Sequence, residues 1–503
     1  MASTFVGLSI ASSGLNAAQV GMTVTTNNMS NIDTTGYSRQ VVNQTSIGPA
    51  AVYSSSLVGN GVEVTSVDSV RSFRLDQKYW QENSAASLWE AKSTYLEQAE
   101  TILGSTDTSY ISTALDTFNT ALDSLATDPT STSARAVVLE AAESVCSTLN
   151  DASSQLTQLR SDINSDVKTT VDQINSYATQ IAALNKQITL ATASGASTNE
   201  LEDQRGLLVD ELSGLVGCDV TKADDGSLTI SVEGTTLVKG NNAKELECYT
   251  VTDTTSDQYG MYGIRWADSG EDFDSGDSGA LNGYLEVRDG NSSDSKGIPY
   301  YLSQLDDFAR TYAEAFNEGV TSGTTTYSGH ADGVGIDEAE TTGIRFFSYD
   351  DLSSEELMAS GTDTEAVYQN ITAANISVSK DIQEDTNKIA TASSDGEESN
   401  TENLDDIISI CSSVAISGNA TVDDLYSTII ATVATDSSYA QVSYNRKDAI
   451  ATYIDTSRSS VSGVSSDEET VNLTIYESAY AASASVTSTW NEIYETTLNM
   501  VDD

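Results

Sequence analysis

The sequence predicts a mainly α-helical protein with β-rich inserts, an α+β fold. In the first 32 residues apolar side chains recur every seven positions, and from 134 to 193 they follow a 3/4 spacing. From Gly217 to Gly240 the spacing changes to two, which is typical of strands. We therefore expect terminal helices paired in a coiled-coil-like bundle, a long helical rod domain, outer β-rich domains, and a nested, discontinuous domain order.

The first segment predicts a helix that packs lengthwise on another helix. Burying its six large apolar side chains would contribute on the order of 9–18 kcal/mol. Fixing its backbone costs roughly 28–56 kcal/mol, of which local hydrogen bonds offset only a part. We therefore expect contacts from other subunits to complete this helix. The predicted assembly interface consists of Phe5, Leu8, Ala11, Leu15, Ala18, Met22, Met29 and Ile32.

The stretch "NNMSNIDTTGYSRQ", residues 27–40, predicts the end of this helix. Asn and Asp side chains bond back to the backbone, and Gly36 supplies a positive φ without steric cost. The chain then leaves in an extended conformation. We expect Tyr37 to bury its ring with the hydroxyl in water, and Arg39 to bind a carboxylate.

The last segment, 466–503, predicts a second long helix. Ser465 is a suitable N-cap, and the acids that follow it suit the helix dipole. This segment has eight acids and no base, whereas residues 1–32 carry no charged side chain, so pairing of the two segments avoids repulsion. Its wide apolar face predicts an assembly or chaperone interface of Leu473, Ile475, Tyr476, Ala479, Tyr480, Ala482, Val486, Trp490, Ile493 and Met500.

Between the ends, helical patterns dominate residues 84–213 and 299–319 and return over 366–460. A hairpin is expected around the Asp-Asp-Gly-Ser turn at 224–227, within a strand-and-loop region that extends to about Arg288. The resulting domains are a terminal helical domain (1–40 with 466–503), a helical rod domain (41–215 with 281–320 and 366–465), a β-rich outer domain (216–280) and a small loop or β insert (321–365).

The composition argues against several functions. The 75 acids and 23 bases give a formal net charge of −52, which repels nucleic acid and anionic membranes. The N-terminus lacks the basic region of a signal peptide, and no run of about 18 apolar residues predicts membrane insertion. The four cysteines show no CxxC spacing, although a Cys218–Cys248 bridge stays open.

No constellation in the sequence indicates catalysis. The single histidine, His330, lies in a Gly-rich stretch without triad partners and is read as a loop residue. The acids at 268–279 fit no EF-hand register, and the glycines at 332–343 fit no phosphate loop. We therefore expect no enzyme, and no catalytic, metal-binding or cofactor-binding residue.

The stretch at 27–40 resembles the N-terminal signature of the flagellar axial family of rod, hook and hook-associated proteins, with the pattern N-x-x-N-x-x-T-x-G-Y. The signature residues are Asn28, Asn31, Thr34, Gly36, Tyr37, Ser38, Arg39 and Gln40. The Ser-Arg-Gln continuation is similar to the hook-associated members that join hook to filament. "NELEDQRGLLVDELS" (199–213), "SGALNGYLEVRDG" (278–290) and residues 462–486 resemble further motifs of these members, so the likeness extends in order along nearly the whole chain.

The resemblance implies a structural component of the bacterial flagellum that joins hook to filament by self-assembly after type III export. The terminal helices would line the inner tube, and the helical rod would surround them. The implied partners are further copies of the chain, hook protein, the second hook–filament junction protein and a cytosolic export chaperone. The implied location is the extracellular hook–filament junction, preceded by the cytoplasm before export.

Two alternatives stay open at this stage. A hook or distal-rod subunit would share the terminal helices, but these usually lack the Ser-Arg-Gln continuation and the long helix. A surface enzyme or adhesin exported through the flagellum would need a catalytic or ligand-binding constellation within residues 216–365, where the sequence shows none.

Overall fold

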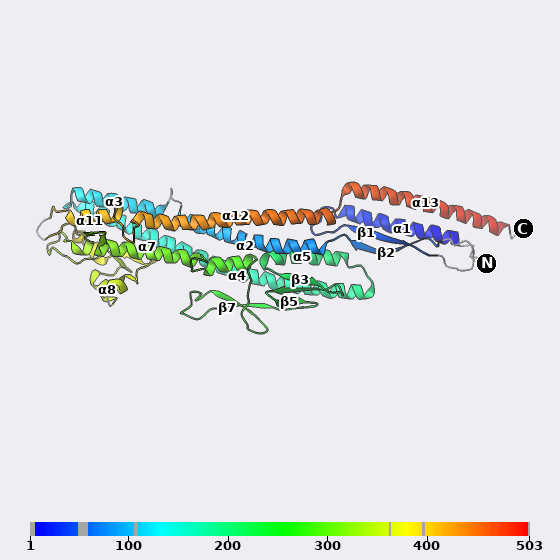
Figure 1. Ribbon diagram of the computed structural model, residues 1–503, viewed down its shortest axis with the longest axis horizontal. Helices are drawn as coiled ribbons and strands as arrows, with labels where there is room; N and C mark the ends of the chain where they lie inside the picture. Colours follow the sequence, from blue (N-terminus) through cyan, green and yellow to red (C-terminus); the bar gives the residue numbers. More distant parts are fainter. Residues whose placement is uncertain (1–5, 49–58, 105–108, 362–363, 395–397, 501–503) are drawn as a thin grey trace.

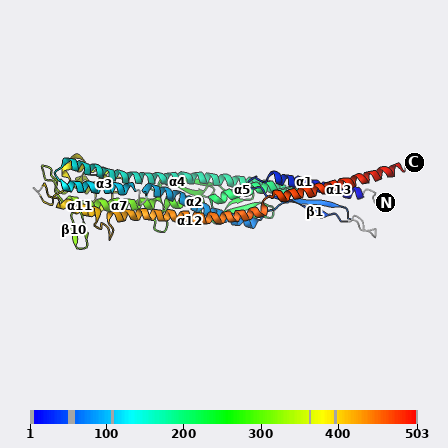
Figure 2. The ribbon, with the colours of Figure 1, turned by 90° about the horizontal axis from the view of Figure 1, so that it is seen from above.

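The protein is an elongated bundle whose two chain ends lie at the same extremity (Figure 1). The computed structural model describes residues 6–48, 59–104, 109–361, 364–394 and 398–500. Long helices run away from this extremity, and the chain turns back at the opposite one (Figure 2). The chain therefore leaves along the bundle and returns along it.

Helices form most of the described chain. Their bounds are α1 Val6–Ser30, α2 Phe73–Leu103, α3 Tyr110–Thr127, α4 Thr132–Ser194, α5 Asn199–Leu215, α6 Ala280–Asp289, α7 Ile298–Glu318, α8 Ser354–Ala359, α9 Thr364–Tyr368, α10 Lys380–Glu384, α11 Glu402–Ser412, α12 Val422–Ser462 and α13 Ser466–Asn499. Two short 3₁₀ turns, η1 and η2, cover His330–Asp332 and Thr386–Lys388.

The strands of the described residues form small antiparallel sheets. Strands β3 to β6 form a four-stranded sheet, and the other strands pair as β1–β2, β7–β8, β9–β10 and β11–β12. Their bounds are β1 Gln40–Ser46, β2 Val62–Ser69, β3 Asp219–Lys222, β4 Leu228–Val232, β5 Thr235–Lys239, β6 Asn242–Ala243, β7 Leu246–Thr250, β8 Tyr262–Trp266, β9 Val320–Ser322, β10 Thr325–Tyr327, β11 Phe347–Tyr349 and β12 Ile376–Val378.

Helix α4 is the longest element, with 63 residues, and covers the stretch where the 3/4 spacing predicts a rod. The Ser131 side chain accepts a hydrogen bond from the Ala134 backbone N–H at its start, and Gly195 ends it in the left-handed conformation. One face of α4 is buried along its whole length because isoleucine, leucine, valine and alanine recur there.

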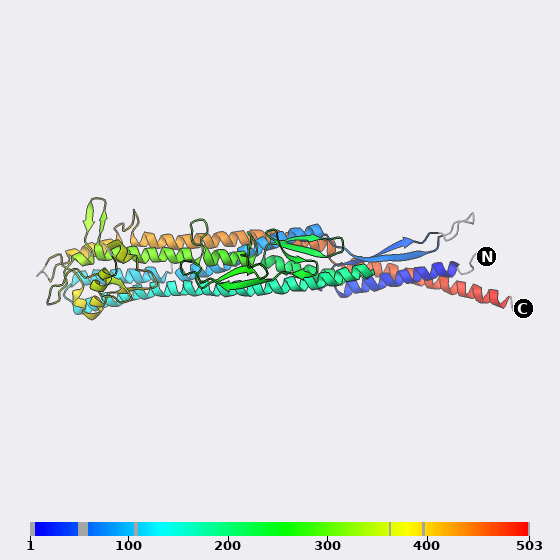
Figure 3. The same cartoon turned by 90° about the horizontal axis from the view of Figure 1, so that it is seen from below.

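Two apolar cores lie along the bundle. One, at the extremity far from the chain ends, contains aromatic side chains of α3, α7 and α12 packed around Phe118 and Phe347. The other joins the second half of α4 to α5 and to the sheet of β3–β6 (Figure 3). The hairpin expected at 224–227 is present: Gly226 has φ +82°, and Asp225 accepts hydrogen bonds from Ser227.

Several details differ from the sequence-based expectations. Residues 280–289 form helix α6, where a strand-and-loop region was expected, because Leu281 and Val287 follow a helical spacing into the core. Residues 366–400 are mostly loops with short elements, not a long helix, because buried apolar residues occur there without a helical period. Within 321–365, Phe346 and Phe347 are fully buried, so this segment contributes to the main core.

The structure shows the state of the four cysteines and of the single histidine. All four cysteines are free, so the open Cys218–Cys248 bridge is not formed. His330 is buried: its Nδ1 lies 2.7 Å from the Ile344 carbonyl, and its Nε2 accepts a hydrogen bond from the Ala390 N–H. Burial lowers the pKa of His330 from 6.5 to about 4, so the ring is neutral at pH 7.

Candidate assembly surface

Helices α1 and α13 lie side by side in opposite directions at the end where the chain begins and finishes (Figure 1). Gly7 faces the Trp490 ring, Gly14 faces Ser483, and Gly21 faces the Tyr476 ring. Both sets are spaced by seven, so the helices keep the same register over four turns. A Cβ atom at Gly7 would lie 2.2 Å from Trp490 and one at Gly21 would lie 2.5 Å from Tyr476, so the helices approach closely.

The residues of α1 that contact α13 come one position before the expected apolar residues: Gly7, Gly14 and Gly21 precede Leu8, Leu15 and Met22. Small side chains dominate the buried face of α1, and Ala11 and Ala18 are among them. The larger Leu8, Leu15, Met22 and Met29 are half-buried, and Ile32 lies past the helix end and is exposed. Phe5 lies outside the described residues. The glycine heptad was the signal in the sequence that could have located the contact.

Helix α13 uses one narrow face to contact α1. Its only buried residue is Glu469, and Leu473, Tyr476 and Trp490 are half-buried. The other members of the predicted C-terminal interface are exposed: Ile475, Ala479, Tyr480, Ala482, Val486, Ile493 and Met500. An apolar stripe at helical spacing is therefore left without a partner in the single chain.

The signature loop fastens the end of α1 to strand β1. Asn28 is buried, and its side-chain amide accepts a hydrogen bond from the Gln40 N–H at 2.9 Å and donates one to the Gln40 carbonyl at 2.9 Å. The Tyr37 hydroxyl also donates to the Asn28 side-chain oxygen at 2.8 Å, a protein partner that the sequence did not indicate. Burial, with the nearby Asp203 carboxylate, raises the pKa of Tyr37 to about 12. Gly36 turns the chain with φ +80°.

The same loop joins the terminal helices to the rest of the bundle. The Ser38 N–H donates to the Asp203 carboxylate of α5 at 2.9 Å. The Arg39 N–H donates to the Ser462 carbonyl at the end of α12, and its guanidinium contacts Glu468 of α13, each at 2.8 Å. The expected pairing of Arg39 with a carboxylate is therefore present. The roles of Asn31 and Thr34 are local, since both bond within the loop.

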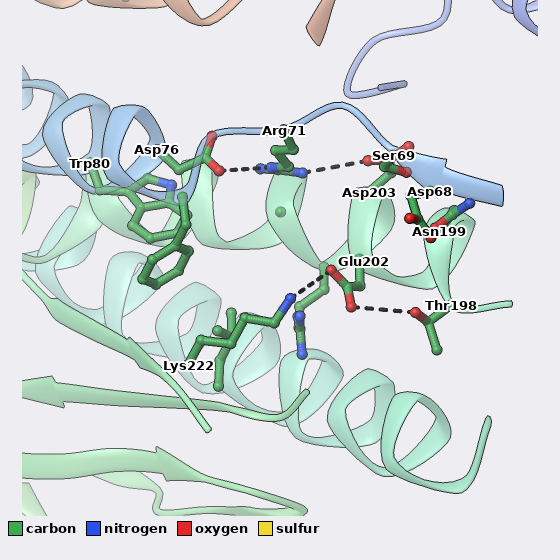
Figure 4. A pocket seen from close by; sticks show the side chains of 14 residues that line it. Asp68, Ser69, Arg71, Asp76, Trp80, Thr198, Asn199, Glu202, Asp203 and Lys222 are labelled. Atoms are coloured by element: carbon green, nitrogen blue, oxygen red, sulfur yellow. Dashed lines mark hydrogen bonds and ion pairs between the residues drawn. The ribbon is translucent and has the colours of Figure 1, made fainter. Parts of the chain in front are cut away.

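A group of charges lies beneath this loop. Arg71 lies between Asp76 and Asp203, 2.8 Å and 3.6 Å from their carboxylate oxygens (Figure 4). Arg458 of α12 contacts Asp210 of α5 at 2.8 Å. These ion pairs are at least three-quarters buried, and loss of one partner would leave an uncompensated charge.

Burial determines the titration of these carboxylates. It raises the pKa of Asp203 and Asp210 above the ordinary value, although Arg71 and Arg458 oppose the shift. A pocket of about 310 Å³ adjoins the group, and its wall also carries Lys222, which binds Glu202 at 2.9 Å (Figure 4). Two arginines, Arg71 and Arg458, contact three aspartates of α2 and α5, so the group acts as a brace between α2, α5 and α12.

Sequence reasoning did not single out Asp203, Arg71 or Arg458 as parts of this joint. Asp203 belongs to the motif at 199–213, which was the available signal. In the part of the chain that the structure describes, no group of three potential metal ligands gathers. Likewise, none of the described helices combines the length and apolar character required to cross a bilayer.

Comparison with known proteins decides the family. Flagellar hook-associated protein 1 of Bacillus subtilis (strain 168) is 30% identical over 99% of this chain and 99% of its own length. The chain belongs to the flagellar hook-associated protein 1 family. The proteins of the same name from Escherichia coli (strain K12) and Salmonella typhimurium are each 26% identical over 97% of this chain, covering 98% and 99% of their own lengths.

Other matches agree with this family. Residues 96–335 match the family model described as flagellar hook-associated protein FlgK helical domain, and residues 8–37 match that of the flagella basal body rod protein. The fold resembles the flagellar hook junction protein FlgK from Burkholderia pseudomallei, with a TM-score of 0.61 and 17% identity over 77% of this chain and all of that one. The chain is thus a structural component of the flagellum, outside the cell at the hook–filament junction, in a family not known for enzymes.

Proposed function

We propose that α1 and α13 form the surface through which copies of this chain assemble into the inner tube of the junction. The remaining helices, within residues 41–215, 281–320 and 366–465, would surround that tube, and residues 216–280 would project outward. The observation that carries this proposal is the exposed apolar stripe of α13, because α1 covers only the opposite half of that helix.

The expected partners follow from the position of the chain at the junction. Copies of the chain contact one another laterally, hook protein lies below them, and the second junction protein lies above. Before export the chain is cytoplasmic, and a chaperone covers the stripe of α13 before the unfolded chain passes the type III exporter. An amphipathic helix of this kind suits such a groove-type partner.

The test is assembly of purified protein on isolated hooks, observed by electron microscopy. Ile475→Asp combined with Val486→Asp places two charges on the stripe, and we expect capping of hooks to be lost because buried unpaired charges cost several kcal/mol. Tyr259→Asp, which changes a side chain that is 57% exposed in a loop beyond β7, is the matched control and should cap normally. Normal capping by the double variant would contradict the proposal.

A further inference from the structure

Exposed apolar side chains gather on two consecutive helices. Of the nineteen large apolar side chains that are exposed among the described residues, twelve lie on α12 or α13 or at the end of α13. Those of α12 are Tyr439, Val442, Ile450, Tyr453 and Val461. Tyr453 is 73% exposed. Such a concentration marks an interaction surface.

The five α12 residues lie on one face of the helix because their spacings of 3, 8, 3 and 8 fit the helical period. We call this face the α12 stripe. The adjoining face, with Ala440, Ser443 and Ala451, is buried. Arg446 lies in the middle of the stripe, is exposed, and forms no ion pair with an acid of the described chain. Tyrosine and arginine are the residues that contribute most at protein interfaces.

The free charge of the α12 stripe is opposite to that of the chain. Of the three bases of residues 439–461, Lys447 and Arg458 pair with Glu82 and Asp210, which leaves Arg446 available on the exposed face, in a protein with a formal net charge of −52. Helix α13, residues 466–499, holds six acids and no base. The two exposed apolar stripes are therefore complementary in charge, and contact between them gains attraction where most other contacts between copies meet repulsion.

The two stripes of one chain cannot meet. Only residues 463–465 separate the helices, and α13 continues away from the end of α12 along α1, past the end of the bundle (Figure 1, Figure 3). The backbone of residue 463 donates to Ser459, and Arg39 binds both helices at this point. A partner for the α12 stripe must therefore come from another molecule.

We propose that the α12 stripe of one copy binds the acidic apolar face of α13 of a second copy, with Arg446 near Glu492. Glu492 is exposed and borders that face: it precedes Ile493 in the sequence, and its side chain projects about 100° around the helix from that of Ile493. The contact joins different surfaces of two identical chains, so it repeats from copy to copy and generates rings or helical arrays. The inference rests on the proposed function. It adds a second contact surface to that assembly, one that joins the copies head to tail.

A charge exchange tests the proposal on the full chain. Arg446→Glu places like charges together, and we expect assembly on isolated hooks to need at least about tenfold more protein. Arg446→Glu combined with Glu492→Arg restores the opposite pair and should recover most of the assembly. Lys239→Glu, an exposed base of the outer sheet without an ion pair to a described acid, changes the net charge equally and is the control.

The outcomes separate this inference from the proposed function. Loss of assembly with Arg446→Glu and recovery in the double variant support it. Unchanged assembly, an equal loss with Lys239→Glu, or no recovery in the double variant overturns it. If Arg446→Glu weakens attachment to hooks but not association of copies with one another, the stripe binds hook protein and the proposal is wrong. Failure of the unaltered protein to cap hooks would instead reject the proposed function.

Discussion

Glycines at positions 7, 14 and 21 determine how closely the first and last helices approach. A side chain at Gly21 would meet the Tyr476 ring, whereas Asn16 of the same helix is exposed. We expect Gly21→Val to weaken the helix pair by roughly 1–3 kcal/mol through overpacking. Amide exchange of α13 should therefore accelerate.

The control for this prediction is Asn16→Val, which introduces the same side chain on the exposed face. Equal exchange of α13 in the two variants would show that the glycine contact does not hold the pair. The apolar heptad of α1 predicted a packed helix, but the contact face is marked by glycines. A search for regularly spaced apolar side chains does not count glycine, but two helices need glycine at the contact to approach closely.

The buried His330 makes the stability of the fold depend on pH. Its pKa is lowered from 6.5 to about 4 by burial, so the unfolded chain binds the proton more readily. Its contribution to stability is complete above pH 6.5 and is lost as the pH falls towards 4, by up to about 3 kcal/mol. Urea unfolding at pH 7.5 and 4.5 measures this loss.

The matched variant is His330→Gln, which cannot titrate in this range. The difference in unfolding free energy between the natural protein and this variant should shrink as the pH falls. A difference that stays constant between pH 7.5 and 4.5 would mean that His330 does not carry the effect. The sequence reading of His330 as a loop residue missed its burial, because its two partners, Ile344 and Ala390, lie far along the chain.

At the scale of elements, the connection between α1 and the bundle depends more on the buried hydrogen bonds of Asn28 than on the exposed ion pair of Arg39. Asn28 is 1% exposed and pairs with the Gln40 backbone, so Asn28→Ala should cost about 2–3 kcal/mol by leaving that backbone unpaired. Arg39→Ala removes an ion pair with Glu468, whose side chain is 66% exposed, and should cost less than about 1 kcal/mol.

Limited proteolysis of the 31–39 loop, with thermal unfolding, compares the two variants. We expect faster cleavage in Asn28→Ala than in Arg39→Ala. The reverse order would show that the exposed ion pair fastens the joint.

Periodicity predicted the long elements well and the short ones poorly. Helix α4 was expected from 134 to 193 and covers Thr132–Ser194, because a long buried face leaves a regular pattern. Residues 366–400 contain buried Tyr368, Ile376 and Ile382 without a regular pattern, because loops and short turns bury them. The brace of Arg71, Asp203 and Arg458 joins residues from three distant segments, so no local pattern could reveal it.

At the scale of the whole molecule, charge opposes the association of copies. Each chain carries a formal net charge of −52, and this repulsion is screened at about 10 Å in 0.1 M salt and about 3 Å in 1 M salt. We expect assembly, followed by light scattering, to accelerate as sodium chloride rises between these values. Slower assembly at high salt would show that specific ion pairs outweigh the overall repulsion.

The closeness of Gly7 and Trp490 also has a consequence for the order of folding. The two residues are separated by nearly the whole chain, so their contact is among the least local in the molecule. During synthesis the first helix emerges long before its partner exists, so it has no partner until the end of the chain has been made. The two extremities can therefore meet only in a finished chain, and a chain that is exported unfolded must join them again outside the cell.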